Sequence, residues 1–297
     1  MANHDPGVLD QQTMADGQIL RRRSWPLPDA RQAVLLVHGL GEHSGRYLHV
    51  AAWFRARGFD VRSYDQRGHG LTQGPRGALR RDDDLLSDLT AVYTEYASGR
   101  AQPPLLLGHS MGGLVTARAV LDGRVTPGAL LLTSPALRSW ATPALRKLAH
   151  GLTSLLPNLP LGNGLKTDQL SRDAAVVAAY RADRLCFGRI TPRLANFIFS
   201  AGDACVADAH TLAVPTLLLV ASADTLVDPA GSTDFAAAAW ATRQLTTRHF
   251  AGFYHELMNE IQPARTQVMK QMGDWLDRLP SAANGGSWLP ASDALPR

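Results

Sequence analysis

A serine between glycines follows an apolar stretch near the middle of the chain. Residues 105–107 are apolar, residues 108–112 read Gly-His-Ser-Met-Gly, and apolar side chains at helical spacing follow. A strand, a sharp turn and a helix in this order are the context in which a G-x-S-x-G motif forms a nucleophile elbow. We therefore predict that Ser110 is a nucleophile at the carboxyl edge of a sheet. The start of the helix would aim the Met111 amide at the developing oxyanion, as one donor of an oxyanion hole.

A serine hydroxyl is a weak nucleophile, so it needs a base and a further group that orients the base. In proteins with this elbow, the order along the chain is serine, acid, histidine. Asp224 follows the apolar segment 217–220 and is predicted to be the acid. Asp228 stands directly before Pro229, and an N-cap role explains it without catalysis.

Two histidines follow these acids before the last predicted helix. His249 lies inside a predicted strand, 245–250, whereas His255 follows a loop after that strand. Loops at the carboxyl edge of a parallel sheet are where catalytic groups gather, so His255 is predicted to be the base. A second oxyanion donor is expected in the loop 38–41, His-Gly-Leu-Gly, where the Leu40 amide is the predicted group.

Two other interpretations of these segments are disfavoured. Residues 39–44 follow a predicted strand as a dinucleotide-binding loop would, but Ser44 takes the third glycine position and Glu42 would place a negative charge beside a pyrophosphate. The segment 255–259, His-Glu-Leu-Met-Asn, matches half of a zinc H-E-x-x-H motif, with Asn259 in place of the second histidine. The sequence contains no P-loop motif. No metal and no cofactor are therefore predicted.

Short apolar segments alternate with helical patterns along most of the chain. This alternation predicts βαβ units and an α/β fold built on a parallel sheet. Helical spacing follows Asp82-Asp83-Asp84, and the last strong helix is expected over 257–279. The predicted strands are 33–37, 59–64, 104–107, 129–132, 215–220 and 245–250.

The alternation stops between about residues 137 and 213, where no strand is predicted. A structureless loop of that length does not suit a compact domain, so this stretch should hold helices of its own. Two interpretations of an apolar stripe in it remain open. The stripe packs on the core, or it belongs to a cap over a pocket and contacts an acyl chain or a membrane surface. Its members share one helical face and are Leu145, Leu148, Leu152, Leu155 and Leu156.

Composition and charge limit the function classes further. The 297 residues are 45% hydrophobic and 19% charged, which allows a large core and excludes a disordered chain. The net charge of +4 includes one basic run, 21–23, and one acidic run, 82–84, and both are expected to be solvated surface. No nucleic-acid partner is therefore predicted. Cys186 and Cys205 are too few for a disulfide framework, and no secretory signal or membrane span is recognised, so a cytoplasmic protein is expected.

Several segments together resemble the monoacylglycerol lipase and lysophospholipase group of α/β-hydrolases. They are residues 38–47, 65–70, 108–113 and 222–224, and the resemblance runs from about residue 18 to 278. It implies a mostly parallel eight-stranded sheet with helices on both faces and an inserted helical cap. The expected division is a hydrolase core over 1–137 and 211–280, a cap or lid over 138–210, and a flexible C-terminal tail over 281–297.

The resemblance also implies a serine esterase. Monoacylglycerol would be cleaved to fatty acid and glycerol through an acyl-enzyme on Ser110. Glu42, Arg46 and Tyr180 would lie near the glycerol end of the pocket. For two of them a structural interpretation remains open, because Arg46 could pair with Glu42 and Tyr180 could be a packing residue of the cap. Met258 stands where animal monoacylglycerol lipases carry a second histidine, so the head-group preference is less specified than the ester chemistry.

Other activities remain open beside this one. Within enzymes they are a lysophospholipase, a carboxylesterase of broader specificity and an acyltransferase. The other class is a ligand-binding α/β-hydrolase without catalysis. The expected partners are a lipid ester substrate and, through the cap, a membrane surface in transient contact. The oligomeric state is not predicted.

Overall fold

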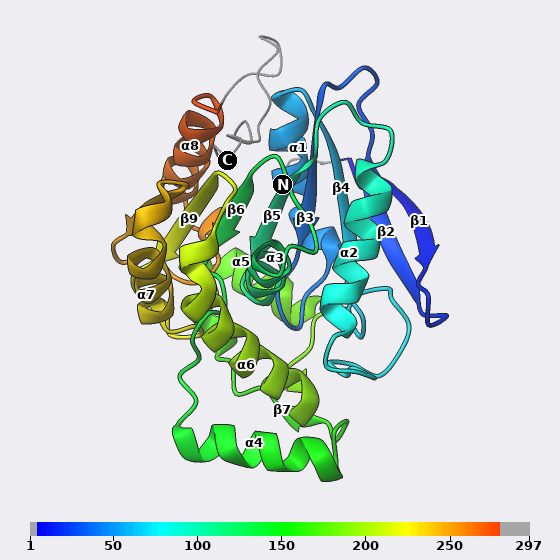
Figure 1. The fold of residues 1–297 in the computed structure, drawn as a ribbon, viewed down its shortest axis with the longest axis vertical. Coiled ribbons are helices and arrows are strands. Elements are labelled where there is room, and N and C mark those ends of the chain that lie inside the picture. Colours follow the sequence, from blue (N-terminus) through cyan, green and yellow to red (C-terminus); the bar gives the residue numbers. More distant parts are fainter. Residues whose placement is uncertain (1–4, 280–297) are drawn as a thin grey trace, which may run out of the picture.

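The computed structural model describes residues 5–279, which form an eight-stranded sheet (Figure 1). The strand order is β1-β2-β4-β3-β5-β6-β9-β10. The two N-terminal strands run antiparallel to their neighbours, and all the other pairs are parallel. The mostly parallel eight-stranded sheet expected from the resemblance is thus confirmed. The strands are β1 (Val8–Thr13), β2 (Ile19–Trp25), β3 (Gln32–Val37), β4 (Phe59–Asp65), β5 (Leu105–His109), β6 (Leu130–Thr133), β9 (Thr216–Ala221) and β10 (Leu245–Phe250).

The basic run 21–23 lies inside β2, which was not among the predicted strands. Side chains alternate between the two faces of a strand, so Arg22 shares its face with the buried Leu20. Its guanidinium reaches Asp10 at 2.8 Å and Glu95 at 3.0 Å. The expectation that this run is solvated surface is therefore wrong for Arg22, because long-range pairing across the sheet supplies partners that sequence spacing does not reveal.

Helices cover both faces of the sheet (Figure 1). One face packs against α1 (Leu48–Ala56) and α8 (Ala264–Leu276). The other face carries α2 (Asp84–Ala97), α3 (Met111–Leu121), α6 (Pro192–Asp208) and α7 (Pro229–Ala239). Because both faces are covered, the central strands are apolar throughout instead of alternating, as expected for a parallel sheet.

The last helix begins later than expected. Residues Leu257–Asn259 form a short 3-10 helix, and α8 begins at Ala264 and ends at Leu276. Pro263 stands directly before α8, and proline is tolerated at a helix start but not inside a helix. The continuous helix predicted over 257–279 is therefore wrong. The other 3-10 segments are Ser44–Tyr47, Thr167–Gln169, Ala209–Thr211 and Trp240–Thr242.

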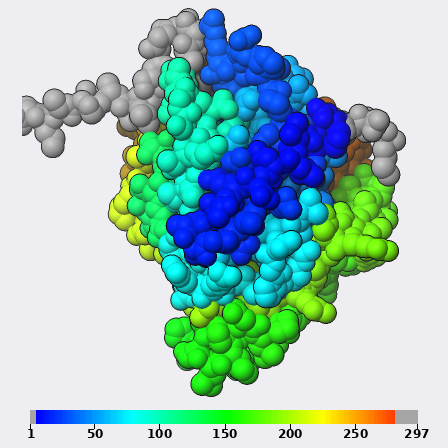
Figure 2. All heavy atoms as spheres, turned by 90° about the vertical axis from the view of Figure 1, so that its right-hand side faces the viewer, coloured from blue at the N-terminus to red at the C-terminus, as the bar shows by residue number. Residues whose placement is uncertain are grey.

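The insertion between β6 and β9 is mainly helical, as expected. It contains α4 (Pro143–Leu155), α5 (Ala174–Ala182) and α6, with one two-residue antiparallel pair of strands, β7 (Leu161–Gly162) and β8 (Arg189–Ile190), that was not predicted. Helix α4 lies away from the sheet, beyond α6, and the green segment that contains it projects from the molecule in Figure 2. Helix α6 instead packs against α3 and α7. The cap boundaries at 138 and 210 remain predictions, and the expected tail over 281–297 lies outside the described residues.

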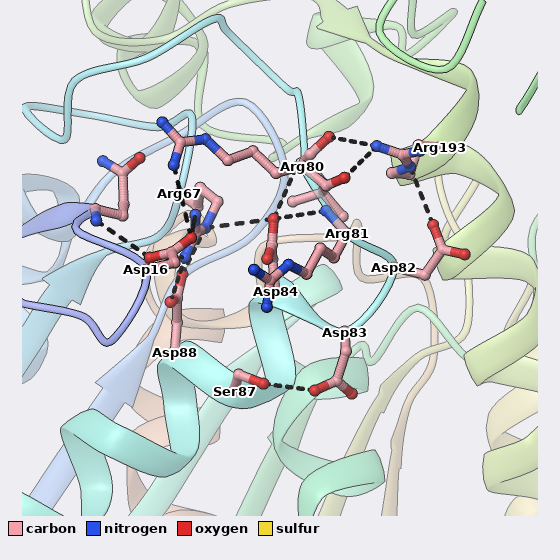
Figure 3. A network of polar contacts seen from close by, with 12 residues as sticks. Asp16, Arg67, Arg80, Arg81, Asp82, Asp83, Asp84, Ser87, Asp88 and Arg193 are labelled. Atoms are coloured by element: carbon pink, nitrogen blue, oxygen red, sulfur yellow. Dashed lines mark hydrogen bonds and ion pairs between the residues drawn. The ribbon is translucent and has the colours of Figure 1, made fainter.

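The acidic run 82–84 at the start of α2 belongs to a network of polar contacts (Figure 3). Asp84 is buried and its carboxylate accepts the backbone amides of Arg80 at 2.7 Å and Arg81 at 2.9 Å. Asp82 is exposed and pairs with Arg193 of α6 at 3.1 Å. The expectation of a solvated run is therefore wrong for Asp84, which caps the turn that precedes its own helix. The pair between Asp82 and Arg193 attaches the start of α6 to that same segment.

The turn between β5 and α3 has no room for side chains beside Ser110. A Cβ added to Gly108 would lie 2.5 Å from the Gly112 carbonyl oxygen. A Cβ added to Gly112 would lie 2.2 Å from the carbonyl oxygen of Val37, at the end of β3. Ser110 itself has φ 54° and ψ −121°, a conformation that L-residues rarely adopt. Glycine at 108 and 112 therefore lets α3 start against β3 and holds Ser110 in its strained turn.

We predict opposite effects of alanine at two helical glycines. Gly112→Ala should destabilise the protein by several kcal/mol, on the order of 3, because backbone atoms of β3 must move. Gly151→Ala in α4, where no atom lies within 4 Å of the added Cβ, should stabilise the protein by about 0.5–1 kcal/mol. Urea unfolding of both variants measures the difference. Equal stability of the two variants would contradict the close approach at Gly112.

Candidate active site

Ser110 stands between the end of β5 and the start of α3, where the sequence placed it. Its backbone amide donates to the Thr133 carbonyl at 3.0 Å, and its carbonyl accepts the amides of Leu114 and Ala136. The turn is therefore hydrogen-bonded to the first turn of α3 and to the end of β6 with the residues that follow it. Ser110 lines a cavity at the carboxyl edge of the sheet.

Asp224 and His255 meet across two loops at the same edge. Asp224 follows β9, and one of its oxygens accepts the amides of Leu226 at 2.8 Å and Val227 at 3.0 Å. The other oxygen lies 2.6 Å from His255 Nδ1. Both residues are buried, with 5% and 4% of their surface exposed. His255 Nδ1 is therefore occupied by the carboxylate, which leaves Nε2 as the nitrogen able to exchange a proton elsewhere.

The competing candidates lie apart from this pair. Asp228 is the N-cap of α7, where its carboxylate accepts the Ala230 amide at 2.9 Å and Pro229 is the first helical residue. This confirms the interpretation of Asp228 as a helix cap. His249 lies within β10 and is exposed.

Burial and pairing shift the pKa values of Asp224 and His255 in opposite directions. Burial alone would lower the pKa of His255, but the adjacent Asp224 carboxylate raises it above its usual value. Burial alone would raise the pKa of Asp224, but the His255 ring and the amide donors lower it. The nearby His109 has its pKa lowered to about 4, by burial first and by His255 second. The Asp224 carboxylate therefore makes His255 more basic than usual, whereas burial favours the neutral form of His109.

The loop after β3 brings Leu40 to the wall of the cavity that Ser110 also lines. The Gln66 amide donates to His38 Nε2 at 2.9 Å, so the proton of this neutral ring is on Nδ1 and is donated to the Gly39 carbonyl at 2.8 Å. This bond holds the peptide plane between residues 39 and 40. Within residues 5–279, neither the Leu40 nor the Met111 amide has a protein acceptor. Both residues border the cavity with Ser110, so the two amides are available to an oxyanion.

The three residues predicted near a glycerol group form a buried cluster instead of cavity wall. The Arg46 guanidinium lies 2.7 Å from Glu42, and the Tyr180 hydroxyl donates to the Gly41 carbonyl at 2.9 Å. Burial alone would raise the pKa of Glu42, but Arg46 lowers it to about 2. Among the described residues that line the cavity, none of these three is included. Their role in binding a head group remains a prediction. The contacts agree with a structural role, because Arg46 pairs with Glu42 and Tyr180 is hydrogen-bonded to the Gly41 carbonyl.

Glu256 was not predicted as a site residue, and it completes this cluster. Its carboxylate receives both ends of the Arg46 guanidinium, at 2.7 and 2.8 Å. It is buried and directly follows His255. In the sequence it stood out only as part of an incomplete zinc motif. The available signal for Glu256 was its place directly after the predicted base, His255, in a loop that must be buried.

A cavity of about 700 Å³ extends from Ser110 and His255 toward the cap. Three of the five leucines of the predicted stripe line it, and Leu155 and Leu156 do not; all except Leu152 are also exposed on the outer side of the cap. The wall is mainly aliphatic and comes from α4, α6 and the segment after Asp224. Its apolar side chains include Leu40, Met111, Leu145, Leu148, Ala149, Leu152, Leu161, Ala195, Ile198, Phe199, Leu226 and Val227. An apolar ligand of substantial length can therefore reach the serine.

One group of side chains in the described residues has the spacing of a metal site. It consists of His43, Asp183 and Cys186, whose ligand atoms lie within 4.8 Å of one another. The Gly45 amide donates to His43 Nδ1 at 3.1 Å, which places the proton on Nε2, 2.8 Å from Asp183. A metal at Nε2 would have to displace that proton and its bond. The group is therefore explained by a hydrogen bond that links the loop after β3 to the cap.

Comparisons with known proteins agree with this geometry. The family model described as serine aminopeptidase, S33, matches residues 28–262. A monoacylglycerol lipase of Mycolicibacterium smegmatis is 34% identical over 84% of this chain and 90% of its own length. The crystal structure of Paleococcus ferrophilus monoacylglycerol lipase is 32% identical, with a TM-score of 0.80 over 86% of this chain and 98% of that chain.

A longer relative is also similar. An uncharacterized abhydrolase domain-containing protein of Dictyostelium discoideum is 30% identical over 91% of this chain, and the chain spans 29% of the length of that protein. Within residues 5–279, no helix combines the length and the apolar character needed to cross a bilayer. The family model covers most of the chain, and the sheet, the elbow and the relatives agree with it. The protein therefore belongs to the serine hydrolase family described as serine aminopeptidase, S33, within the α/β-hydrolase superfamily.

Proposed function

We propose that the protein hydrolyses carboxylic esters of lipids with one acyl chain, with monoacylglycerol as the substrate. The observation that carries this proposal is the position of Ser110 and the Asp224–His255 pair at one end of the 700 Å³ apolar cavity. Burial of a single acyl chain in such an apolar cavity is favourable by about 0.8 kcal/mol for each CH₂ removed from water. The two relatives named monoacylglycerol lipase support the choice of substrate.

The reaction follows from the free nitrogen of His255. Nε2 takes the Ser110 proton as Oγ attacks the ester carbonyl, and the oxyanion receives the Leu40 and Met111 amides. When the tetrahedral intermediate collapses, the C–O bond to the alcohol breaks and Nε2 returns the proton to the leaving oxygen, which releases glycerol. Water then attacks the acyl-enzyme with His255 again as the base, and the fatty acid leaves. Asp224 holds the ring and stabilises its charged form.

Three finer inferences accompany this proposal. Exposed apolar side chains on the cap, Leu148 and Leu155 among them, suit transient contact with a lipid surface. We take residues 138–210 as the cap, and α4, whose residues line the cavity, as the outer wall of the acyl site. The free thiols of Cys186 and Cys205 suit a cytoplasmic location.

Replacement of the nucleophile is the direct test. Ser110→Ala should retain less than a few per cent of the turnover of 1-monolaurin and of 4-nitrophenyl laurate, because no acyl-enzyme can form. Substitution of the buried Ser134, whose hydroxyl donates to the His255 carbonyl, is unsuitable as a control, so Ser98→Ala, at an exposed position after α2 that does not line the cavity, serves instead and should keep the wild-type turnover.

The same assay distinguishes the alternatives. Preference for lysophosphatidylcholine over 1-monolaurin would favour a lysophospholipase, and preference for butyrate over laurate esters would contradict the lipid assignment. Absence of multiple turnover on every ester would indicate a binding protein.

The pH dependence should reflect the neutral form of His255. Because Asp224 raises the pKa of His255, the acidic limb of kcat/KM should lie above pH 6.5, and activity should fall as the pH drops through that limb. Asp224→Asn should lower kcat by on the order of 10⁴-fold, because the carboxylate no longer holds the required tautomer.

Asp228→Asn is the matched control, since asparagine also caps a helix and this variant should keep the wild-type profile. A wild-type limb below pH 6.5 would contradict the assigned pair, as would equal losses in the two variants.

A further inference from the structure

We infer that Arg46 is a positioning residue, which ties the loop that carries the Leu40 amide to the loop that carries His255. This inference rests on the proposed function, because those two groups act in the proposed reaction. It differs from the head-group role that the resemblance implies, since it assigns to Arg46 no contact with substrate.

The guanidinium of Arg46 bridges two buried carboxylates from distant parts of the chain. Its Nη1 lies 2.7 Å from Glu42 and 2.7 Å from Glu256, and its Nη2 lies 2.8 Å from Glu256. Each of the two glutamates is 3% exposed. Burial alone would lower the pKa of Arg46, but the two carboxylates raise it well above its usual value. The guanidinium therefore stays charged, and it offers two parallel donors to Glu256 that fix direction as well as distance.

Glu42 passes this constraint to the peptides around Leu40. Its Oε1 accepts the Gly39 amide at 2.6 Å and the Tyr47 hydroxyl at 2.9 Å, while its Oε2 binds Arg46. The Gly39 amide belongs to the peptide before the one that His38 holds. Two consecutive peptide planes are thus fixed, and the Leu40 N–H belongs to the second of them. A rotation of the Leu40 amide away from Ser110 would have to break these bonds.

Glu256 passes the constraint to the other side of the site. Its amide donates to the Leu170 carbonyl at 2.8 Å, and its Oε2 accepts the Asn259 side chain at 2.9 Å. The side chain therefore cannot turn freely, and the residue before it is His255. The Arg46 bridge holds an oxyanion donor and the catalytic base in one rigid unit, although their loops are more than 200 residues apart in sequence.

Lysine at position 46 would keep the charge but not the geometry. An ammonium is a point charge without a planar fork, so it cannot bind Glu256 through two parallel bonds and also reach Glu42. Misplacement of a catalytic group by about 1 Å costs up to about 100-fold in rate. Arg46→Lys should therefore reduce kcat while leaving substrate binding in the cavity intact.

Arg172 provides a matched control. Its guanidinium binds Glu260 at 2.9 Å, a fully buried acid in the same loop as Glu256, and lies over the Phe253 ring. Arg172→Lys thus removes the same kind of arginine–carboxylate contact from the His255 loop without touching the Leu40 loop.

The experiment compares 1-monolaurin with 4-nitrophenyl laurate, which share the acyl chain but not the glycerol. Arg46→Lys should lower kcat by about 10- to 100-fold, by the same factor within about twofold on both esters, with KM changed less than about threefold. Arg172→Lys should change kcat by less than about twofold. A loss confined to 1-monolaurin and seen in KM would overturn the inference in favour of head-group binding. An unchanged kcat in Arg46→Lys, or an equal loss in Arg172→Lys, would also overturn it.

A second variant covers the case in which Arg46→Lys does not fold, as judged by thermal unfolding. Glu256→Gln keeps the side-chain volume and removes the charge that Arg46 binds, and it should show the same equal loss of kcat on both esters.

Where all variants fold, the double variant should lose no more kcat than the worse single variant, because both changes break the same bridge. Additive losses would contradict a shared role. A wild-type protein inactive on both esters would contradict the proposed function itself, which is a separate outcome.

Discussion

Helix α3 starts in direct contact with the end of β3, and this close approach organises the whole site. The Gly112 position touches the Val37 carbonyl, and in the same register Val37 lies opposite Gly108 of β5. The chain leaves β3 at that point, so its next residues must pass beside the turn at Ser110. A Cβ on Gly39 would lie 3.1 Å from the Ser110 Cβ. One packing constraint therefore brings the loop that contains Leu40 against the turn that contains Ser110 and Met111.

Buried charge imposes a second constraint on the carboxyl edge. Asp224, Glu42 and Glu256 are all nearly inaccessible, and a carboxylate in such a place must be paired or hydrogen-bonded. Asp224 is satisfied by His255 and two amides, whereas the two glutamates share Arg46. Removal of one partner would leave a buried charge without its counter-charge, so these clusters hold the loops rigidly. The same bonds that satisfy these carboxylates also constrain the orientation of the Leu40 amide and of the His255 imidazole.

Local patterns in the sequence were sufficient for much of this structure. The predicted core strands, the elbow at Ser110 and the helix cap at Asp228 depend on neighbouring residues, and all were recovered within one or two positions. Asp224 and His255 followed from chain order together with their positions after predicted strands, and the structure brings them within hydrogen-bond distance.

What the sequence could not reveal depends on contacts between distant segments. The burial of Arg22 requires the β1–β2 hairpin and Glu95 of α2, and the Arg46–Glu256 bridge joins loops that are 210 residues apart in sequence. Neither pair of residues has a spacing along the sequence from which its contact could be predicted. The late start of α8 has a local cause, because Pro263, which stands directly before the helix, ends the helical pattern of the residues before it.

The most direct test is a crystal structure of the protein after reaction with a lauryl phosphonate that carries a good leaving group. We expect phosphorus bonded to Ser110 Oγ, a phosphoryl oxygen within hydrogen-bond distance of the Leu40 and Met111 amides, and the lauryl chain along Leu145, Leu148 and Leu152. A phosphonate attached to another residue, or a lauryl chain outside the cavity under α4, would contradict the proposed lipid esterase.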